Sequence, residues 1–315
     1  MMNKCGLYIH IPFCNHLCSY CDFTKRVSND FVKAKYIDAL IHELKIYQSQ
    51  GFDFKNISSI YIGGGTPSSL NVDLLKQLFN YLESIIDLKN LNEFTFEVNP
   101  EDLNDELSDS LFSASVTRVS IGIQTLNPVL QKQIGRTFDF DKFKNDYNYL
   151  KTKIPNINFD LMYALPNQTV LDCVSTLEQL MALEPKHFSI YSLILEKHTK
   201  LYHDYLKGDI KLIDEDLELE MLDAITKSLN GKYFKYEVSN YAMDGYESYS
   251  NIISPHSASF SQKRDRGATT GGGRGAERRR TTRATSTYTT SRDTIRRSFS
   301  SLGEGQSRER TGDNA

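Results

Sequence analysis

The stretch IPFCNHLCSYCDF, residues 11–23, places three cysteines within eight positions of a chain that contains only five. It follows the alternating run GLYIHI, residues 6–11, whose period of two predicts a β-strand. Cys14, Cys18 and Cys21 would therefore lie in the loop that leaves this first strand. Thiols grouped so closely indicate a metal or redox centre.

Length and composition indicate a globular protein around this centre. The 315 residues, 39% of them hydrophobic, are enough for one large α/β domain or two smaller ones. We see no signal-like segment at the N-terminus and no window that approaches the ~18 apolar residues of a membrane helix, so we expect a cytoplasmic protein without a membrane span. In a reducing cytosol, clustered cysteines serve as metal ligands more often than as disulfides, and five is an odd number.

The composition changes near Ser250. Residues 250–315 carry 13 Lys and Arg but only 6 Asp and Glu, a net charge of +7 that leaves −10 for residues 1–249. The later segment is rich in Arg, Gly and Thr and has few apolar residues with which to offset its ordering entropy. We therefore predict a folded domain over 1–249 and a disordered Arg/Gly/Thr-rich tail over 250–315. The tail lacks interleaved aromatics, so nucleic acid is not an expected partner.

Short β-type runs alternate with longer amphipathic runs along residues 1–249. The strands are predicted at residues 7–11, 59–62, 93–98, 118–123, 157–161 and 187–191. Helices are predicted at residues 31–48, 72–86, 102–114, 140–151 and 170–183, with starts such as Asn71 and Asp102, followed by an acidic, solvent-exposed helix at 212–228. Repeated βα units predict a parallel α/β sheet, and six of them favour a partial (β/α)6 barrel over a closed eight-stranded one.

Residues just past each strand of such a fold line one rim, where sites are assembled. Polar and glycine residues occupy these places: the three cysteines, residues 63–67, Glu97, Asn99, Gln124 and Asp160. They should converge on the thiols. Three thiolates are one short of a closed metal site, which leaves two alternatives: zinc with His10 or His16 as fourth ligand, or a [4Fe-4S] cluster with one open iron.

Five motifs, in order, resemble one family. They are CNHLCSYC at residues 14–21, YIGGGTPSSL at 61–70, EVNP at 97–100, SIGIQT at 120–125 and DLMYALPNQT at 160–169. Together they are similar to the radical S-adenosyl-L-methionine (SAM) superfamily and, within it, to the oxygen-independent coproporphyrinogen III oxidase-like family. The resemblance implies that Cys14, Cys18 and Cys21 ligate three irons of a [4Fe-4S] cluster. The amino and carboxylate groups of SAM would chelate the fourth iron, and reduction would yield a 5′-deoxyadenosyl radical.

The same resemblance implies the contacts to SAM. Gly64, Gly65 and Thr66 would let the backbone approach its methionine end, because glycine has no Cβ. The other implied contacts are Tyr8, which would face the site; Tyr20 and Ile194, bordering the adenine; and Glu97, Gln124, Arg136 and Asp160, with Arg136 as the cation for the carboxylate. Several of these groups also have an interpretation that needs no ligand: a tight βα turn for the glycines, ordinary aromatic packing for the tyrosines, and a surface position for Arg136. Cys5 and Cys173 match no ligand position, and we interpret them as small buried hydrophobes.

The position two after the third cysteine separates branches of the family. Members that decarboxylate coproporphyrinogen III have a fourth cysteine there, whereas this chain has Phe23, which resembles the heme chaperone (HemW-type) branch. Heme or a related tetrapyrrole, and heme-acceptor proteins, are then the implied partners, and the oxidase is the alternative function. Residues 236–242 and 245–248 also match this branch. The family motif His-Asn-x-x-Tyr-Trp should follow, but of Ser250, Asn251, Ser254 and Pro255 only the asparagine agrees.

Overall fold

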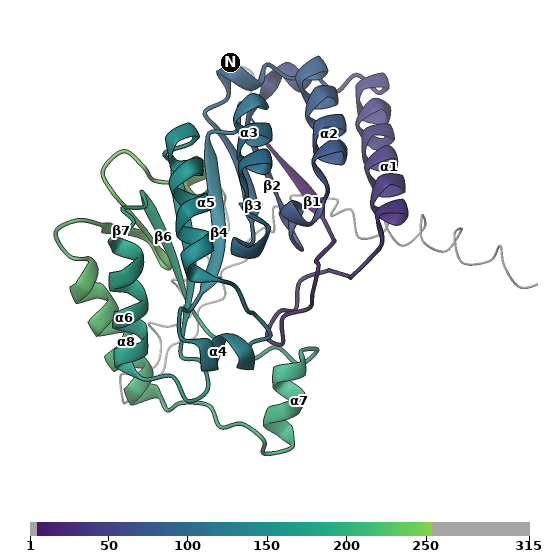
Figure 1. The fold of residues 1–315 in the computed structure, drawn as a ribbon. Coiled ribbons are helices and arrows are strands. Elements are labelled where there is room, and N and C mark those ends of the chain that lie inside the picture. The colour runs from purple at the N-terminus through teal and green to yellow at the C-terminus, as the bar shows by residue number, and fades with distance from the viewer. Residues whose placement is uncertain (1–4, 254–315) are drawn as a thin grey trace, which may run out of the picture. The chain divides into compact units, whose positions relative to one another are not determined.

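The computed structural model describes residues 5–253 and contains one eight-stranded sheet in the order β1-β2-β3-β4-β5-β6-β8-β7 (Figure 1). The strands are β1 (Cys5–Ile11), β2 (Ile57–Gly64), β3 (Glu93–Val98), β4 (Arg118–Gln124), β5 (Ile157–Tyr163), β6 (His187–Ser192), β7 (Phe234–Glu237) and β8 (Asn240–Ala242). β1 to β6 are parallel, and β8 and β7 extend the sheet as an antiparallel pair. The predicted α/β fold with six parallel strands is confirmed.

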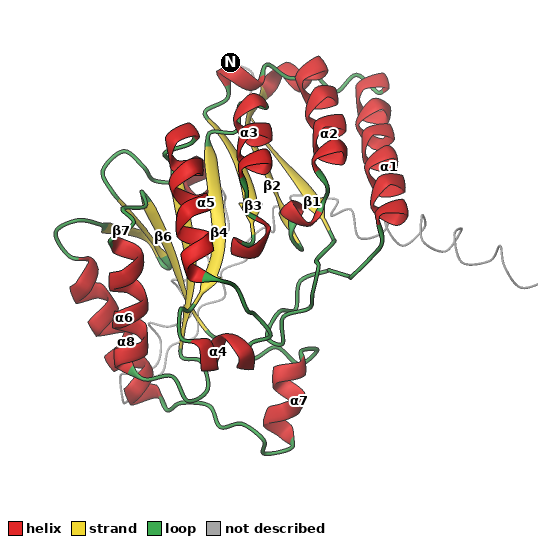
Figure 2. Ribbon diagram, viewed as in Figure 1, coloured by secondary structure: helices red, strands yellow, loops and turns green. Residues whose placement is uncertain are grey.

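Helices connect the parallel strands and stand side by side over one face of the sheet (Figure 2). They are α1 (Asp30–Ser49), α2 (Val72–Ile85), α3 (Asp105–Ser113), α5 (Phe140–Lys153) and α6 (Val170–Met181). α8 (Glu215–Leu229) packs against α6. Among residues 5–253, no helix is both long and apolar enough to cross a membrane.

Short polar side chains fix where the helices begin. Asn71 accepts a hydrogen bond from the backbone N–H of Leu74 and caps α2, as expected. The expected start at Asp102 is wrong, because α3 begins later and is capped by Asn104. Asp102 instead ends a short 3-10 turn, and its carboxylate accepts hydrogen bonds from Ser68 and Asn15.

The sheet is apolar on the helix-covered face. Phe94 and Phe96 of β3 are fully buried there, and both rings meet the ring of Phe79 from α2 edge to face. Thr95 and Glu97, which alternate with these phenylalanines along β3, point to the other face, as the period of two requires. The same alternation in β4, β5 and β6 makes the second face polar.

Besides the β7–β8 pair, three α-helices of the described chain were not predicted: α4 (Pro128–Gln133), α7 (Lys200–Leu206) and α9 (Tyr249–Ile253). Each is too short to show helical periodicity. The acidic helix exists as α8, but Glu218 on it accepts a hydrogen bond from Ser192 and is only half-exposed. Residues 250–253 belong to α9, the rest of the predicted tail lies outside the described residues, and the domain boundary stays a prediction.

Candidate functional site

The loop between β1 and α1, residues 12–29, carries the three cysteines and is closed on itself by an isolated β-bridge between Phe13 and Arg26. The backbone N–H of Cys14 donates to the Arg26 carbonyl at 3.1 Å, and the N–H of Arg26 donates to the Pro12 carbonyl at 2.8 Å. Cys14 is buried, and the hydroxyl of Thr66 lies 3.5 Å from its sulfur as a donor. The first thiol is therefore fixed by the turn that follows β2 as well as by its own loop.

Ser19, between the second and third cysteines, ties the loop to α4 and α7. Its N–H donates to the carbonyl of Ile134 and its hydroxyl to the carbonyl of Gln133, both at 3.0 Å. Its own carbonyl accepts from the N–H of Leu201, in the first turn of α7, at 2.9 Å. Figure 1 shows α4 and α7 together at the end of the sheet where this purple loop lies. The unpredicted helices thus hold the predicted site.

Gly135, which ends α4, packs directly against the loop. Its φ is +74°, and a Cβ there would meet the carbonyl of Leu17 and the N–H of Ser19 at 3.4 Å. Neither Ser19 nor Gly135 was predicted as part of the site. The signal available in the sequence was the neighbouring Arg136, one of three arginines before residue 250.

A small apolar cluster of its own supports the loop. Leu130, Ile134 and Leu165 are buried together, and Tyr20 of the loop packs against them. The Tyr20 hydroxyl interacts with the Arg136 guanidinium, whose charge opposes the rise that burial causes in the pKa of Tyr20. The ring of Tyr20 is therefore a structural support for the loop, in agreement with the packing alternative. The implied contact to the adenine concerns the peptide of Tyr20 and not its ring.

Cys14 and Cys18 of the loop both have shifted pKa values, and their surroundings differ. Burial raises the pKa of Cys14, although the Thr66 hydrogen bond and Lys25 oppose the rise. Burial also disfavours ionisation of Cys18, but a hydrogen bond from His16 and the charge of Arg136 outweigh it and lower the pKa. A thiolate is the form that binds a metal, so Cys18 is prepared for ligation by its neighbours.

Arg136 is a buried arginine, which removes the surface alternative. Only 9% of it is exposed, and its Nη1 donates to Asn99 Oδ1 at 3.1 Å and to the Gly122 carbonyl at 2.8 Å. Its Nε has no partner within the described chain. A cation with an unused donor therefore lies beside Cys18, as a site for an anionic group requires.

Each of the three glycines at the end of β2 and just past it lies close to another part of the protein. A Cβ on Gly63 would meet the Glu97 carboxylate at 2.7 Å, and one on Gly65 would meet the Phe13 carbonyl at 2.8 Å and the Cys14 sulfur at 3.1 Å. Gly64 has φ +122° and faces the His10 ring. These contacts explain the glycines as a tight turn that brings the end of β2 close to the thiols. The same turn leaves a ligand role for Gly64 and Gly65 possible in space, so the two interpretations are compatible.

Two carboxylates lie on the polar face of the sheet. Glu97 accepts from the Tyr61 hydroxyl at 2.7 Å and from the N–H of Gly64 at 3.0 Å. Asp160 accepts from Asn158 Nδ2 at 2.7 Å and from the Ser120 hydroxyl at 3.1 Å. Burial raises the pKa of both carboxyls, that of Glu97 to about 7.

The remaining predicted contacts differ in exposure. Gln124 is buried at the end of β4, where a φ of +67° and a register shift turn the strand toward the rim. Tyr8 is 56% exposed and Ile194, just past β6, is 60% exposed. Both exposed side chains are accessible to a ligand. Cys173 is buried in the main core, and Cys5 is partly buried against it, in agreement with their interpretation as hydrophobes.

The histidines considered as zinc ligands have other partners. His10 hydrogen-bonds the Tyr8 hydroxyl at 3.0 Å and the Thr24 carbonyl at 2.9 Å. His16 hydrogen-bonds the Cys18 thiol, as described above, and its Nε2 lies 3.5 Å from Glu101. Across residues 5–253, no three His, Cys, Asp or Glu side chains converge as they would around a single metal ion. A [4Fe-4S] cluster offers a separate iron to each thiolate, so its ligands need not meet at one point.

A sheet of parallel strands, with three thiols and a buried arginine gathered at the carboxyl ends, defines a partial-barrel protein built to hold a metal cofactor. The model of the radical SAM superfamily matches residues 8–180. This is more than half of the chain, and the chain belongs to that superfamily. Members bind a [4Fe-4S] cluster and SAM, and the donor set described above fits both: three thiols for irons, and Arg136 for a carboxylate.

Within this superfamily, comparison with individual proteins shows which members the chain resembles. The chain is 41% identical over 248 residues to the heme chaperone HemW of Lactococcus lactis, covering 78% of this chain and 64% of that protein. It is 36% identical to the heme chaperone HemW of Bacillus subtilis, covering 78% and 65%. The structure of coproporphyrinogen III oxidase (HemN) from Escherichia coli is similar with a TM-score of 0.68 and 26% identity, covering 76% of this chain and 56% of that one. The chain thus spans about two thirds or less of these proteins.

Proposed function

We propose that this chain is a heme chaperone of the HemW type, which uses a [4Fe-4S] cluster and SAM in the trafficking of heme to acceptor proteins. The observation that carries the proposal is the 41% identity to a heme chaperone over 248 residues, 78% of this chain. The site supports the proposal with three thiols for the cluster and the buried guanidinium of Arg136 for an anionic group. A cytoplasmic location and heme-acceptor partners belong to the same proposal.

In this proposal Cys14, Cys18 and Cys21 hold the cluster, which when reduced supplies an electron to SAM. Arg136 binds the SAM carboxylate through its free Nε edge, since Nη1 is already committed to Asn99 and Gly122. The exposed Tyr8 and the backbone at Ile194 border the nucleoside.

Three groups complete the contacts. Glu97 and Asp160 accept hydrogen bonds from SAM on the polar face, because each carboxylate is held by protein donors that leave further lone pairs. Gln124, turned toward the rim by its positive φ, adds an amide. Gly64, Gly65 and Thr66 form the backbone edge nearest Cys14.

Phe23 favours the chaperone over the oxidase. It is 72% exposed, immediately beyond the third cysteine, where the oxidase-type resemblance calls for a thiol. An exposed phenyl ring cannot donate a proton or a hydrogen atom as a thiol does. Oxidative decarboxylation of coproporphyrinogen III by this chain is therefore the second candidate.

Heme binding by this chain is expected to be weak. Where the family motif has histidine, Ser250 donates hydrogen bonds to the Glu93 carboxylate from its hydroxyl at 2.8 Å and from its N–H at 3.3 Å. No imidazole is offered at that position. Ser254 and Pro255, the other departures from the motif, lie outside the described residues.

The test uses the full chain, purified and reconstituted without oxygen. We expect about four irons per chain and a cluster spectrum in electron paramagnetic resonance that changes when SAM is added. With a reductant and coproporphyrinogen III we expect no decarboxylated product, and Phe23→Cys serves as the matched variant. An unchanged spectrum with SAM would refute the proposal, and product formation by the unaltered chain would establish the oxidase instead.

A further inference from the structure

A continuous set of hydrogen bonds crosses the polar face of the sheet from α9 to Asp160. Tyr236 of β7 bonds His187 Nε2 at 2.7 Å, and His187 Nδ1 bonds Asn158 Oδ1 at 2.6 Å. Asn158 Nδ2 then donates to Asp160 Oδ1 at 2.7 Å. At the other end the N–H of Ser248 and the amide of Asn251 donate to the Tyr236 hydroxyl, at 3.1 and 3.2 Å.

The donors at the α9 end fix the direction of every hydrogen bond. The Tyr236 oxygen accepts two bonds, so its own hydrogen must go to His187. His187 is fully buried, and burial together with the charge of Arg118 lowers its pKa to about 2, so the ring is neutral. A neutral ring that accepts at Nε2 must donate from Nδ1, and Asn158 must present its oxygen to it.

The carboxylate end demands the same direction independently. In its ionised form Asp160 can only accept, and Asn158 then turns its amino group toward it and its oxygen toward His187. Ser120 agrees, because its hydroxyl accepts from Asn158 and therefore donates to Asp160. Ser189 adds a second donor to the Asn158 oxygen at 3.1 Å. With all donors used, neither end can reverse without breaking the other.

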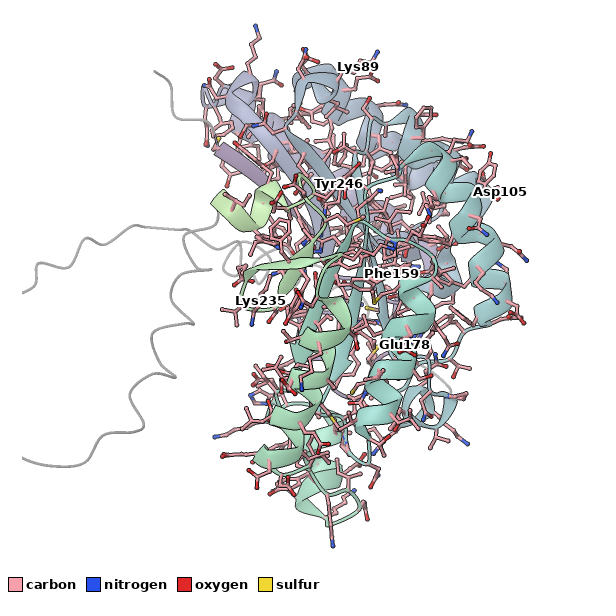
Figure 3. All side chains as sticks on the ribbon, turned by 90° about the vertical axis from the view of Figure 1, so that its left-hand side faces the viewer. Lys89, Asp105, Phe159, Glu178, Lys235 and Tyr246 are labelled. Atoms are coloured by element: carbon pink, nitrogen blue, oxygen red, sulfur yellow. The ribbon has the colours of Figure 1, made fainter. Side chains whose placement is uncertain are left out.

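The α9 end is a defined structural unit. The Glu93 carboxylate accepts from the hydroxyl and N–H of Ser250, the hydroxyl of Ser248 and the N–H of Tyr249. It thereby caps the N-terminus of α9. Figure 3 shows α9, in light green, against the strands at the β1–β2 side of the sheet, and α9 contacts β2. The segment 248–251 is thus held from two sides, by Glu93 and by Tyr236.

We propose that Tyr236, His187 and Asn158 form a hydrogen-bond relay through which segment 248–251 positions Asp160, so that SAM binding and the docking of this segment are coupled. The inference rests on the proposed function, in which Asp160 contacts SAM. Tyr236, His187 and Asn158 are positioning residues, since none of them is proposed to touch SAM. Coupling is reciprocal: SAM stabilises the docked segment by the same factor by which the docked segment strengthens SAM binding.

The experiment removes one hydroxyl from the relay and one from outside it. Tyr236→Phe breaks the connection, whereas Tyr233→Phe removes a buried hydroxyl that donates only to the Pro185 carbonyl at 2.7 Å. In full chain with its cluster reconstituted, SAM affinity is measured from the change in the electron paramagnetic resonance spectrum. We expect Tyr236→Phe to weaken SAM binding about fivefold or more, with unchanged iron content, and Tyr233→Phe to leave the affinity unchanged.

A double-mutant comparison and hydrogen exchange complete the test. Asp160→Asn should weaken SAM binding, and adding Tyr236→Phe to it should cost little more, because the relay acts only through Asp160. SAM should slow amide exchange at residues 248–251 in the unaltered chain but not in Tyr236→Phe. Equal SAM affinities for the two tyrosine variants, with Asp160→Asn impaired, would overturn the relay alone. Normal SAM affinity of Asp160→Asn would overturn both the relay and the proposed role of Asp160.

Discussion

The two faces of the sheet use the same strands for different purposes. On the helix-covered face of β3, Phe94 and Phe96 are completely buried, and each contributes to the core through the apolar area it removes from water. On the opposite face Thr95 is equally buried, yet its hydroxyl has no partner within the described chain. One face is therefore selected for stability, whereas the other keeps polar groups at a cost in stability, which is expected where polar groups are needed for function.

The largest expected effect comes from removing a thiol at the rim of the sheet, which belongs to neither face. Cys14→Ala, Cys18→Ala or Cys21→Ala should each abolish the cluster, because each removes one of three iron ligands. Cys173→Ala, in the core, and Cys5→Ala should keep it. Iron analysis and the brown absorbance of anaerobic samples provide the measurement. Retention of full iron by any of the first three variants would show that the site lies elsewhere.

The next effect contrasts the two faces directly. Phe159, labelled in Figure 3, is fully buried on the helix-covered face of β5 and packs against the rings of Phe143 and Tyr147. Phe159→Ala should lower the free energy of unfolding by about 3–5 kcal/mol. Thr95→Val is the matched change on the polar face and should be neutral or stabilising by about 1 kcal/mol, because it replaces an unpartnered hydroxyl. Urea unfolding that ranks the two variants the other way would contradict the assignment of the faces.

The sequence specified the stable face better than the functional rim. Strand and core residues are visible locally, since the alternation of β3 and the 3.6-residue period of α2 belong to continuous segments. The thiol spacing is also local, and so Cys14, Cys18 and Cys21 could be proposed as ligands from the sequence alone. Burial of Arg136 was not, because the sequence shows a charge but not the Asn99 and Gly122 groups that receive it.

The supporting groups of the site depend on tertiary structure. Ser19 meets Gln133 and Ile134 across more than one hundred residues, and Tyr236 meets His187 across 49. Neither pairing leaves a periodic or compositional signal. The helix α4 that makes the first contact is only six residues long, below the length at which periodicity is informative.

A third test separates backbone strain from support of the loop. Gly135 and Gly231 both have positive φ, +74° and +86°, but only Gly135 lies against the thiol loop, while a Cβ on Gly231 would meet nothing. Each substitution to Ala should cost about 1–2 kcal/mol in backbone strain. Only Gly135→Ala should also alter the cluster spectrum, because a backbone shift that relieves its strain would occur in contact with Leu17 and Ser19, which its Cβ would meet at 3.4 Å. If Gly231→Ala changed the spectrum as much, the effect would be global destabilisation.

The smallest effect concerns the charge of Glu97 on the polar face. Burial, reinforced by the charge of Asp160 and opposed by the Tyr61 hydrogen bond, raises the pKa of this carboxyl from 4.5 to about 7. The folded protein therefore holds the proton more tightly than the unfolded chain does, so this stabilising contribution is complete below about pH 4.5 and is lost as the pH rises to about 7. Glu97→Gln cannot ionise and should lose that dependence. Between pH 5.5 and 8, unfolding by urea should show the unaltered protein losing about 1 kcal/mol more stability than the variant, a value reduced for solvent access.

Glu83→Gln, at an exposed position of α2, should leave the pH dependence unchanged. Parallel pH profiles for Glu97→Gln and the unaltered protein would mean that the polar face does not hold this carboxyl in a strained ionised state. The contrast between the two faces would then rest on packing alone.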